Sequence, residues 1–251
     1  MAQIFHRSAN SLARMSLILA GCAAMALGLA ANELQRSPWV TRQGERAEQP
    51  VPFSHQHHVG GLGLNCQYCH TSVEKSSFAG IPPTRTCINC HSEIWTNAQL
   101  LEPVRASMRE GRSLWWTRVH DLPDFVYFSH EIHIAKGVGC ATCHGRVDEM
   151  PIMYAENSLQ MEWCLDCHRN PAKNLRPKSQ TYNMGWVGPS TDKPVWCADN
   201  AKSCTTEHPL DAANKEKWTQ YTDQMTLGRF LVAQYHVRTP WEITSCETCH
   251  R

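Results

Sequence analysis

Five copies of the pattern Cys-x-x-Cys-His constrain this chain of 251 residues more than any other feature. They contain ten of its 13 cysteines and five of its 14 histidines. Large aliphatic residues are not plentiful, so something other than an aliphatic core is expected to fill the interior. The copies are CQYCH at 66–70, CINCH at 87–91, CATCH at 140–144, CLDCH at 164–168 and CETCH at 246–250.

Two common uses of paired cysteines fit this pattern poorly. The 17 residues between Cys69 and Cys87, and the 20 between Cys143 and Cys164, match the spacing of a zinc ribbon. Zinc, however, does not require a histidine after every pair, and the fifth pair has no partner pair. A thioredoxin-like redox protein needs one such motif near a βαβ pattern rather than five among loops.

Covalent haem attachment uses every part of the motif. Two thiols three positions apart form thioether bonds to one porphyrin, and the histidine that follows binds the iron from the proximal side. The sequence therefore predicts five covalently bound haem c groups. The predicted thioether residues are Cys66, Cys69, Cys87, Cys90, Cys140, Cys143, Cys164, Cys167, Cys246 and Cys249, and the predicted proximal ligands are His70, His91, His144, His168 and His250.

An internal repeat supplies candidates for the sixth, distal ligand of each iron. Phe-Ser-His-x-x-His occurs at 53–58 and again at 128–133, and each copy precedes two of the motifs. Histidines three apart on one helical turn point to the same side, so each pair can reach two neighbouring irons. The predicted distal ligands are His55, His58, His130, His133 and His236, with surface histidine as the alternative reading; His120, Met150, Met153 and Met161 are alternative ligands.

The repeat divides the predicted haem domain into three modules. The first module covers 53–91, the second 128–168 and the shorter third 230–250. We expect a mostly irregular fold with short α-helices, resembling class III cytochromes, packed around the haems. The segment AQLLEPVRASMREG between the first two modules is helix-like but broken by Pro103. Cys197 and Cys204 lie outside the motifs, and in an oxidising compartment they are expected to form a disulfide, with free thiols in a buried loop as the alternative.

The amino terminus contains a membrane-targeting segment. Arg7 and Arg14 precede an uncharged run from Met15 to Ala31, which fits a retained membrane helix or a cleaved signal peptide. A lipidated Cys22 is a third alternative, because Leu-Ala-Gly-Cys at 19–22 resembles a lipobox. We predict a cytoplasmic segment 1–14, a single-pass anchor 15–32 in the inner membrane and a periplasmic domain 33–251. All three alternatives place that domain across the membrane.

Whole strings of the sequence resemble the membrane-anchored pentahaem cytochrome c subunit of bacterial alternative complex III. They are HHVGGLGLNCQYCHTSVEKSSFAGIPPTRTCINCHSEIW, RVHDLPDFVYFSHEIH, GVGCATCHGRVDEMP and SLQMEWCLDCHRNP, followed more weakly by GRFLVAQYH and the final CETCH. The resemblance is strongest from about residue 50 to 170. A broader and less specific likeness connects the HxxH and CxxCH arrangement to the cytochrome c3 and c7 group.

The resemblance implies an electron-transfer subunit of a quinol-oxidising membrane complex, with no catalytic centre of its own. The implied partners are integral membrane quinol-oxidising subunits, an iron–sulfur protein subunit and a monohaem cytochrome c subunit or soluble acceptor. A related quinone reductase or a tetrahaem-type quinol dehydrogenase complex is the alternative. A self-sufficient multihaem reductase fits less well, because all five motifs end in histidine. The net charge of +1 indicates no nucleic-acid partner.

Overall fold

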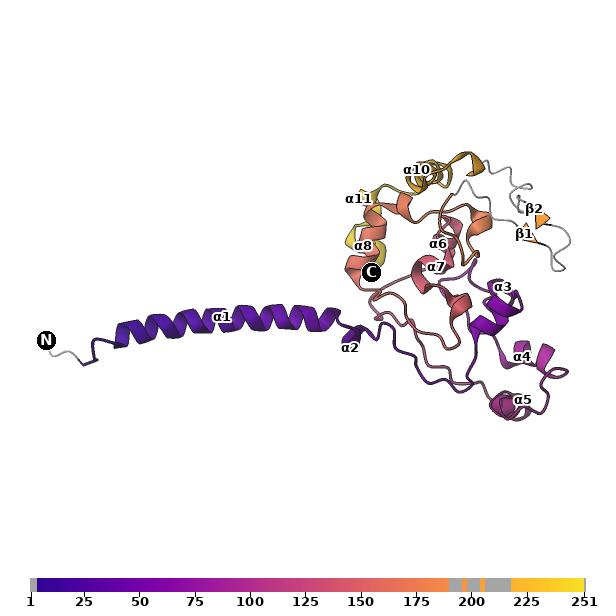
Figure 1. Cartoon of the computed structure of the whole chain (residues 1–251), viewed down its shortest axis with the longest axis horizontal. Helices are drawn as coiled ribbons and strands as arrows, with labels where there is room; N and C mark the ends of the chain where they lie inside the picture. Colours follow the sequence, from indigo (N-terminus) through magenta and orange to yellow (C-terminus); the bar gives the residue numbers. More distant parts are fainter. Residues whose placement is uncertain (1–3, 190–195, 198–203, 206–217, 251) are drawn as a thin grey trace.

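The computed structural model describes residues 4–189, 196–197, 204–205 and 218–250. A long helix, α1 (Ala9–Arg36), projects from a rounded domain that holds all five motifs (Figure 1). None of its 28 residues is buried, and the predicted anchor 15–32 lies within it. By length and composition α1 could cross a membrane, although a signal sequence would have the same properties.

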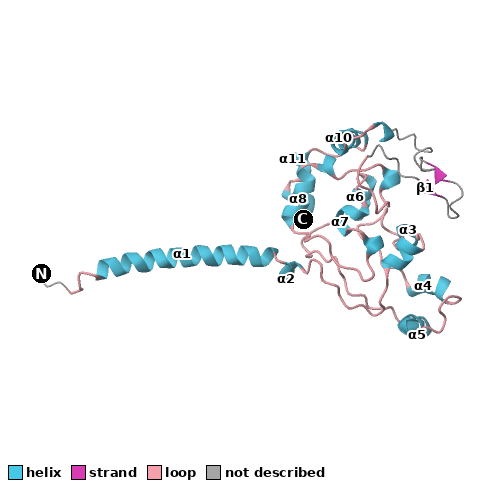
Figure 2. Ribbon diagram, viewed as in Figure 1, coloured by secondary structure: helices cyan, strands magenta, loops and turns pink. Residues whose placement is uncertain are grey.

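Short helices joined by loops make up the domain (Figure 2). This confirms the expected secondary structure. The helices after α1 are α2 (Pro38–Thr41), η1 (Gln56–Gly61), α3 (Cys66–Cys69), α4 (Thr84–His91), η2 (Gln99–Leu101), α5 (Glu102–Glu110), α6 (His130–Ala135), α7 (Cys140–His144), η3 (Val147–Glu149), α8 (Met161–Arg169), η4 (Pro171–Lys173), η5 (Lys178–Gln180), η6 (Trp218–Gln220), α10 (Gln224–Gln234), α11 (Pro240–Ile243) and α12 (Cys246–Cys249).

Two strands of two residues each, β1 (Trp196–Cys197) and β2 (Cys204–Thr205), form an antiparallel pair. The backbone of Cys197 lies opposite that of Cys204. The side chains of both cysteines are outside the described residues, so the disulfide between them stays a prediction.

Both cysteines of each CxxCH motif lie on a helix. In α3, α7 and α12 the first cysteine is the first helical residue, whereas in α4 and α8 the motif begins at the fourth residue. The side chain of Asn65 caps α3 by accepting a hydrogen bond from the Gln67 amide at 2.9 Å. Because residues i, i+3 and i+4 share one side of a helix, α4, α7 and α8 present two thiols and an imidazole together. In α3 and α12 the helix holds the two thiols, and the histidine is the residue that follows its last turn.

The apolar core of the domain is small and lies beside the segments that flank the third and fourth motifs. Helix α10 packs on η4, and Gly228 allows this approach because a Cβ there would overlap the Ala172 carbonyl. Only twelve hydrophobic residues of the described part are buried, so the core alone leaves most of the motif region without an apolar filling. The core cluster is Leu175, Trp218, Leu227, Leu231 and Tyr235.

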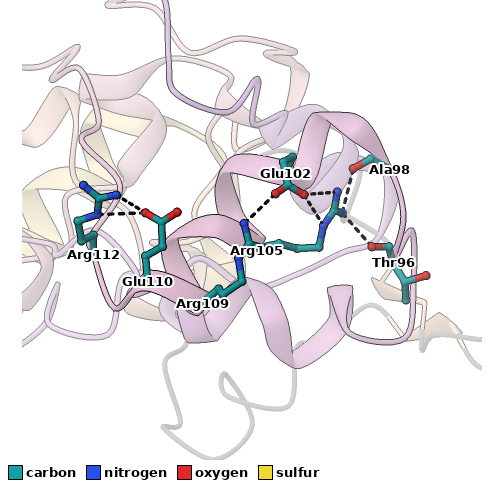
Figure 3. A network of polar contacts seen from close by, with 7 residues as sticks. All are labelled: Thr96, Ala98, Glu102, Arg105, Arg109, Glu110 and Arg112. Atoms are coloured by element: carbon teal, nitrogen blue, oxygen red, sulfur yellow. Dashed lines mark hydrogen bonds and ion pairs between the residues drawn. The ribbon is translucent and has the colours of Figure 1, made fainter.

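Helix α5 supports α4 on the side of the domain opposite α1 (Figure 1). The Thr84 and Ser107 hydroxyls connect the two helices at 2.7 Å. The sequence predicted that Pro103 breaks this helix, and that prediction is wrong. Pro103 lies in the first turn of α5, where no backbone acceptor requires its amide hydrogen. A network of polar contacts surrounds the helix (Figure 3), with Glu102 bound to Arg105 and Arg109, Arg105 bound to the carbonyls of Thr96 and Ala98, and Arg112 bound to Glu110.

Candidate haem-binding site

Four of the five motif histidines are held in the same way. In each, the ring Nδ1 lies within hydrogen-bond distance of a backbone carbonyl, and only the ring can donate in such a pair. The other ring nitrogen, Nε2, then keeps its lone pair for a metal ion. The contacts are His70 to Gly80 O (2.6 Å), His91 to Ile94 O (3.0 Å), His168 to Ile243 O (2.8 Å) and His250 to Phe125 O (3.0 Å).

The same arrangement orients three of the predicted distal histidines. Within the repeated turn, the His58 ring donates to Ser54 O at 2.8 Å and the His133 ring to Ser129 O at 2.7 Å. The His130 ring donates across modules to Ser77 O, also at 2.8 Å. These imidazoles therefore also direct Nε2 away from the backbone.

A phenylalanine fixes both histidines of each turn. The Phe53 ring stacks on His58 with centroids 4.4 Å apart and meets His55 edge-on at 4.9 Å. In the second module Phe128 stacks on His133 at 4.6 Å and meets His130 edge-on at 4.8 Å. The repeated Phe in the sequence is thus a positioning residue for the imidazoles.

Three pairs of imidazoles have the separation that a shared metal ion requires. Two rings on opposite sides of one ion, each bonded at about 2 Å, have centroids about 6 Å apart. Each pair combines a motif histidine with one from the repeated turns. The measured separations and interplanar angles are 6.3 Å and 70° for His58–His91, 6.3 Å and 7° for His130–His144, and 6.2 Å and 22° for His133–His168.

The remaining distal candidate of the first module, His55, is near His70. Burial, followed by the charges of His70 and His58, lowers the pKa of His55 to about 4. Its Nδ1 is buried without a hydrogen-bond partner among the described residues. His55 is therefore a neutral imidazole close to the first motif, but no backbone carbonyl fixes its orientation.

His120 lies near the third motif. Its ring centroid is 4.3 Å from that of His144, too close for two ligands on opposite sides of one ion. Burial lowers the pKa of His120 to about 4 and that of His144 to about 3, so both rings are neutral at pH 7. The geometry favours His130 over His120 as the partner of His144.

The other distal candidates lie outside these pairs. His236 is exposed and has a positive φ of 49°, and no ring contact joins it to a motif histidine in the described part of the chain. Met150 is buried at 2% exposure, whereas Met161 is 66% exposed and Met153 is half-buried. No described contact connects any of these four residues to a motif histidine, and their assignments stay predictions.

The motifs themselves form a row. Cys66 and Cys140 interact through their thiols, which lowers the pKa of Cys66 to about 7, so the first and third motifs are adjacent. After burial, the charges that raise the thiol pKa of Cys69 include that of Cys87. In the same way Cys167 acts on Cys143, and Cys249 on Cys164. The order in space is therefore 87–91, 66–70, 140–144, 164–168 and 246–250.

The donor set fits covalently attached haems. Each motif presents two thiols beside an imidazole, four of these imidazoles have a free Nε2, and three further imidazoles lie at the distance of a second ligand. Zinc sites fit less well, since no group of three or more His, Cys, Asp or Glu side chains in the described ranges is arranged to hold a metal ion. Fold and site together define a multihaem cytochrome c.

Comparison with known proteins agrees with this class. The chain is 32% identical over 144 residues to the multiheme cytochrome c subunit of a menaquinone reductase from Nitratidesulfovibrio vulgaris. The aligned residues cover 49% of this chain and 69% of the relative. The chain belongs to the family of this multiheme cytochrome c subunit, and it binds c-type haems covalently. No protein-family model matches it.

Proposed function

We propose that this chain is the electron-transfer subunit of a membrane quinone-linked complex and carries five haem c groups in a row. The observation that carries the proposal is the spatial order of the five motifs, together with three imidazole pairs 6.2–6.3 Å apart. When bound, haem iron accepts and gives up one electron at a time. The role of the chain is to hold the groups close together and to close their irons with histidine.

Individual ligands follow from the pairs. His58 and His91 hold the haem of the second motif, His130 and His144 that of the third, and His133 and His168 that of the fourth. His55 serves the first motif beside His70, and His236 is the proposed distal ligand for His250. With every iron closed by protein ligands, we assign no catalytic centre to this subunit.

Electrons are exchanged with partner proteins at the two ends of the row. Cys90 and Cys246 belong to the two end motifs, and they are the motif cysteines that are exposed, whereas those of the middle motifs are half-buried. An exposed attachment site places the edge of the attached group near the surface of the subunit. We therefore assign the second motif and the fifth motif to the two partner-facing ends.

The end nearer the membrane is that of the fourth and fifth motifs. The last turn of α1 binds the start of α8 through Arg36 and Glu162 at 2.9 Å. The Gln160 side chain also donates to the Gln35 carbonyl at 2.7 Å. Helices α8 and α11 lie on the side of the domain from which α1 leaves, and α4 and α5 lie on the far side (Figure 1). With α1 as a retained anchor and residues 33–251 in the periplasm, electrons cross between a membrane partner and a partner farther out.

Two directions of electron flow fit this arrangement. The sequence resemblance to alternative complex III favours quinol oxidation, with electrons passing from a membrane subunit and an iron–sulfur protein to a cytochrome c or oxidase. The relative that is named as a menaquinone reductase subunit favours the reverse direction. We assign the quinol-oxidising direction, and both share the same row of ligands.

A reduction experiment on the purified membrane complex distinguishes the two directions. A menaquinol analogue should reduce the haems, as followed by their absorbance, and an added cytochrome c should then reoxidise them. The reductase alternative predicts instead that reduced cytochrome c drives quinone reduction. Haems that neither quinol nor cytochrome c reduces would contradict a quinone-linked role altogether.

A further inference from the structure

A buried arginine lies against the third motif. Arg176 is 5% exposed, and its backbone amide donates to the Gly137 carbonyl at 2.9 Å. Its guanidinium occupies the space beside Gly139, where a Cβ would overlap Cζ. The guanidinium thus packs directly on the residue that precedes Cys140.

The charge of this guanidinium is not neutralised by a described carboxylate. Nη1 donates to the Asn183 carbonyl at 3.0 Å and Nη2 to the Thr142 hydroxyl at 3.2 Å, while Nε has no partner. Glu149 and Glu156 share a cavity of about 640 Å³ with it, yet neither forms an ion pair with it in the described part of the chain. Both of its hydrogen bonds are to neutral oxygens.

A buried cation without a counter-ion is unfavourable, and it acts strongly on nearby charge. Burial lowers the pKa of Arg176 to about 10, which leaves the group charged at pH 7. The hydrogen bond to Thr142, which lies between Cys140 and Cys143, and the contact with Gly139 place this charge beside both attachment residues of the motif.

We propose that the positive charge of Arg176 raises the reduction potential of the haem attached to Cys140 and Cys143. Reduction adds one electron and so lowers the local charge by one, and a buried cation in a medium of low dielectric stabilises that state. The electron comes from the neighbouring haem of the row. The inference rests on the proposed attachment of a haem at this motif and is independent of the direction of electron flow.

The test is a redox titration of the full-length holoprotein with Arg176→Gln and Arg176→Lys, followed by absorbance and by electron paramagnetic resonance. The glutamine variant should lower the reduction equilibrium constant of one haem about tenfold, which is 59 mV for a one-electron couple. The lysine variant keeps the charge and should restore most of the loss. As a matched control, Arg146→Gln changes an exposed arginine two residues after His144, and it should shift the same haem by less than half as much because solvent screens it.

Gly139→Ala is a second variant, since the new methyl group should displace the guanidinium without removing its charge. Gly139→Ala should lower the reduction potential of the same haem. It therefore tests the inference even if the glutamine variant does not accumulate in cells. Unchanged potentials with full haem content would overturn the inference. Equal losses in the glutamine and lysine variants would do so too, by showing a role of hydrogen bonding rather than charge. A wild-type protein without haem at Cys140 and Cys143 would contradict the proposed function instead.

Discussion

The first and second haem modules share the same Phe–His ring contacts and have different supports. In both, a phenylalanine stacks on the second histidine at 23–26° and that histidine donates to a serine carbonyl. The first module rests on α5, whose stabilising contacts include exposed ion pairs. The second is followed by η4, which packs on α10 in the apolar core. The contacts within the repeated turn are thus local, whereas the support of each module comes from different surrounding elements.

The modules also differ in how the two ligand rings are turned. The His58 and His91 rings are 70° apart, while the His133 and His168 rings are 22° apart. The angle between ligand planes sets the splitting of the iron orbitals, so the two haems should give different resonance spectra. With the proposed ligands, the same sequence repeat is expected to give two different electronic environments.

The largest expected effect comes from removing a distal ligand in either module. His58→Ala and His133→Ala should each convert one haem from the low-spin to the high-spin state, because an imidazole is lost from the iron. Absorbance and magnetic resonance measure the change. His57→Ala is the matched control, since this exposed neighbour lies outside the three pairs. A spectrum that does not change in His133→Ala would remove His133 from the ligand set.

The next largest effect is expected when the apolar core that supports the second module loses a buried side chain. Leu227 is 0% exposed, and Leu227→Ala should cost about 2–5 kcal/mol of unfolding free energy through the cavity that it leaves. Leu100→Ala, at a position that is 62% exposed, should change the free energy by no more than about 0.5 kcal/mol. Denaturant unfolding compares the two, and equal effects would argue against α10 as the support.

Acid should destabilise the buried centre of the row. The pKa of His120 falls from its usual 6.5 to about 4 on folding because of burial. Its contribution to stability is therefore complete above about pH 6.5 and is lost as the pH falls toward 4, by up to about 3 kcal/mol. Unfolding midpoints at several pH values should decline less steeply in His120→Gln than in the wild type. Parallel declines would show that His120 does not titrate on unfolding.

The smallest effect is expected from removing an ion pair on α5, the helix that supports the first module. Glu102→Gln removes the partner of Arg105 and Arg109 (Figure 3), but Glu102 and Arg109 are exposed, and Arg105 keeps its hydrogen bonds to the carbonyls of Thr96 and Ala98. Exposed ion pairs contribute little, so the free energy of unfolding should not change measurably. A large loss in thermal unfolding would mean that α5 depends on its charges after all.

The sequence predicted the motif residues and the repeated turn, because thioether attachment requires fixed spacings that can be read directly. The carbonyls that orient the rings could not be read in this way. Gly80, Ile243 and Phe125 act through their backbone oxygens, which any residue possesses, and Ile243 lies 75 positions from its partner His168. Arg176 carried no signal either, because its role depends on burial beside a motif that is distant in sequence.

The central claim is that all five motifs bind haem, including the exposed motifs at the two ends of the row. Intact mass spectrometry of the mature chain tests it most directly, because thioether-bound haem remains attached under denaturing conditions. The account predicts a single species with the mass of the polypeptide plus five haems. A mature chain that consistently carries fewer than five, or that carries zinc at any motif, would contradict it.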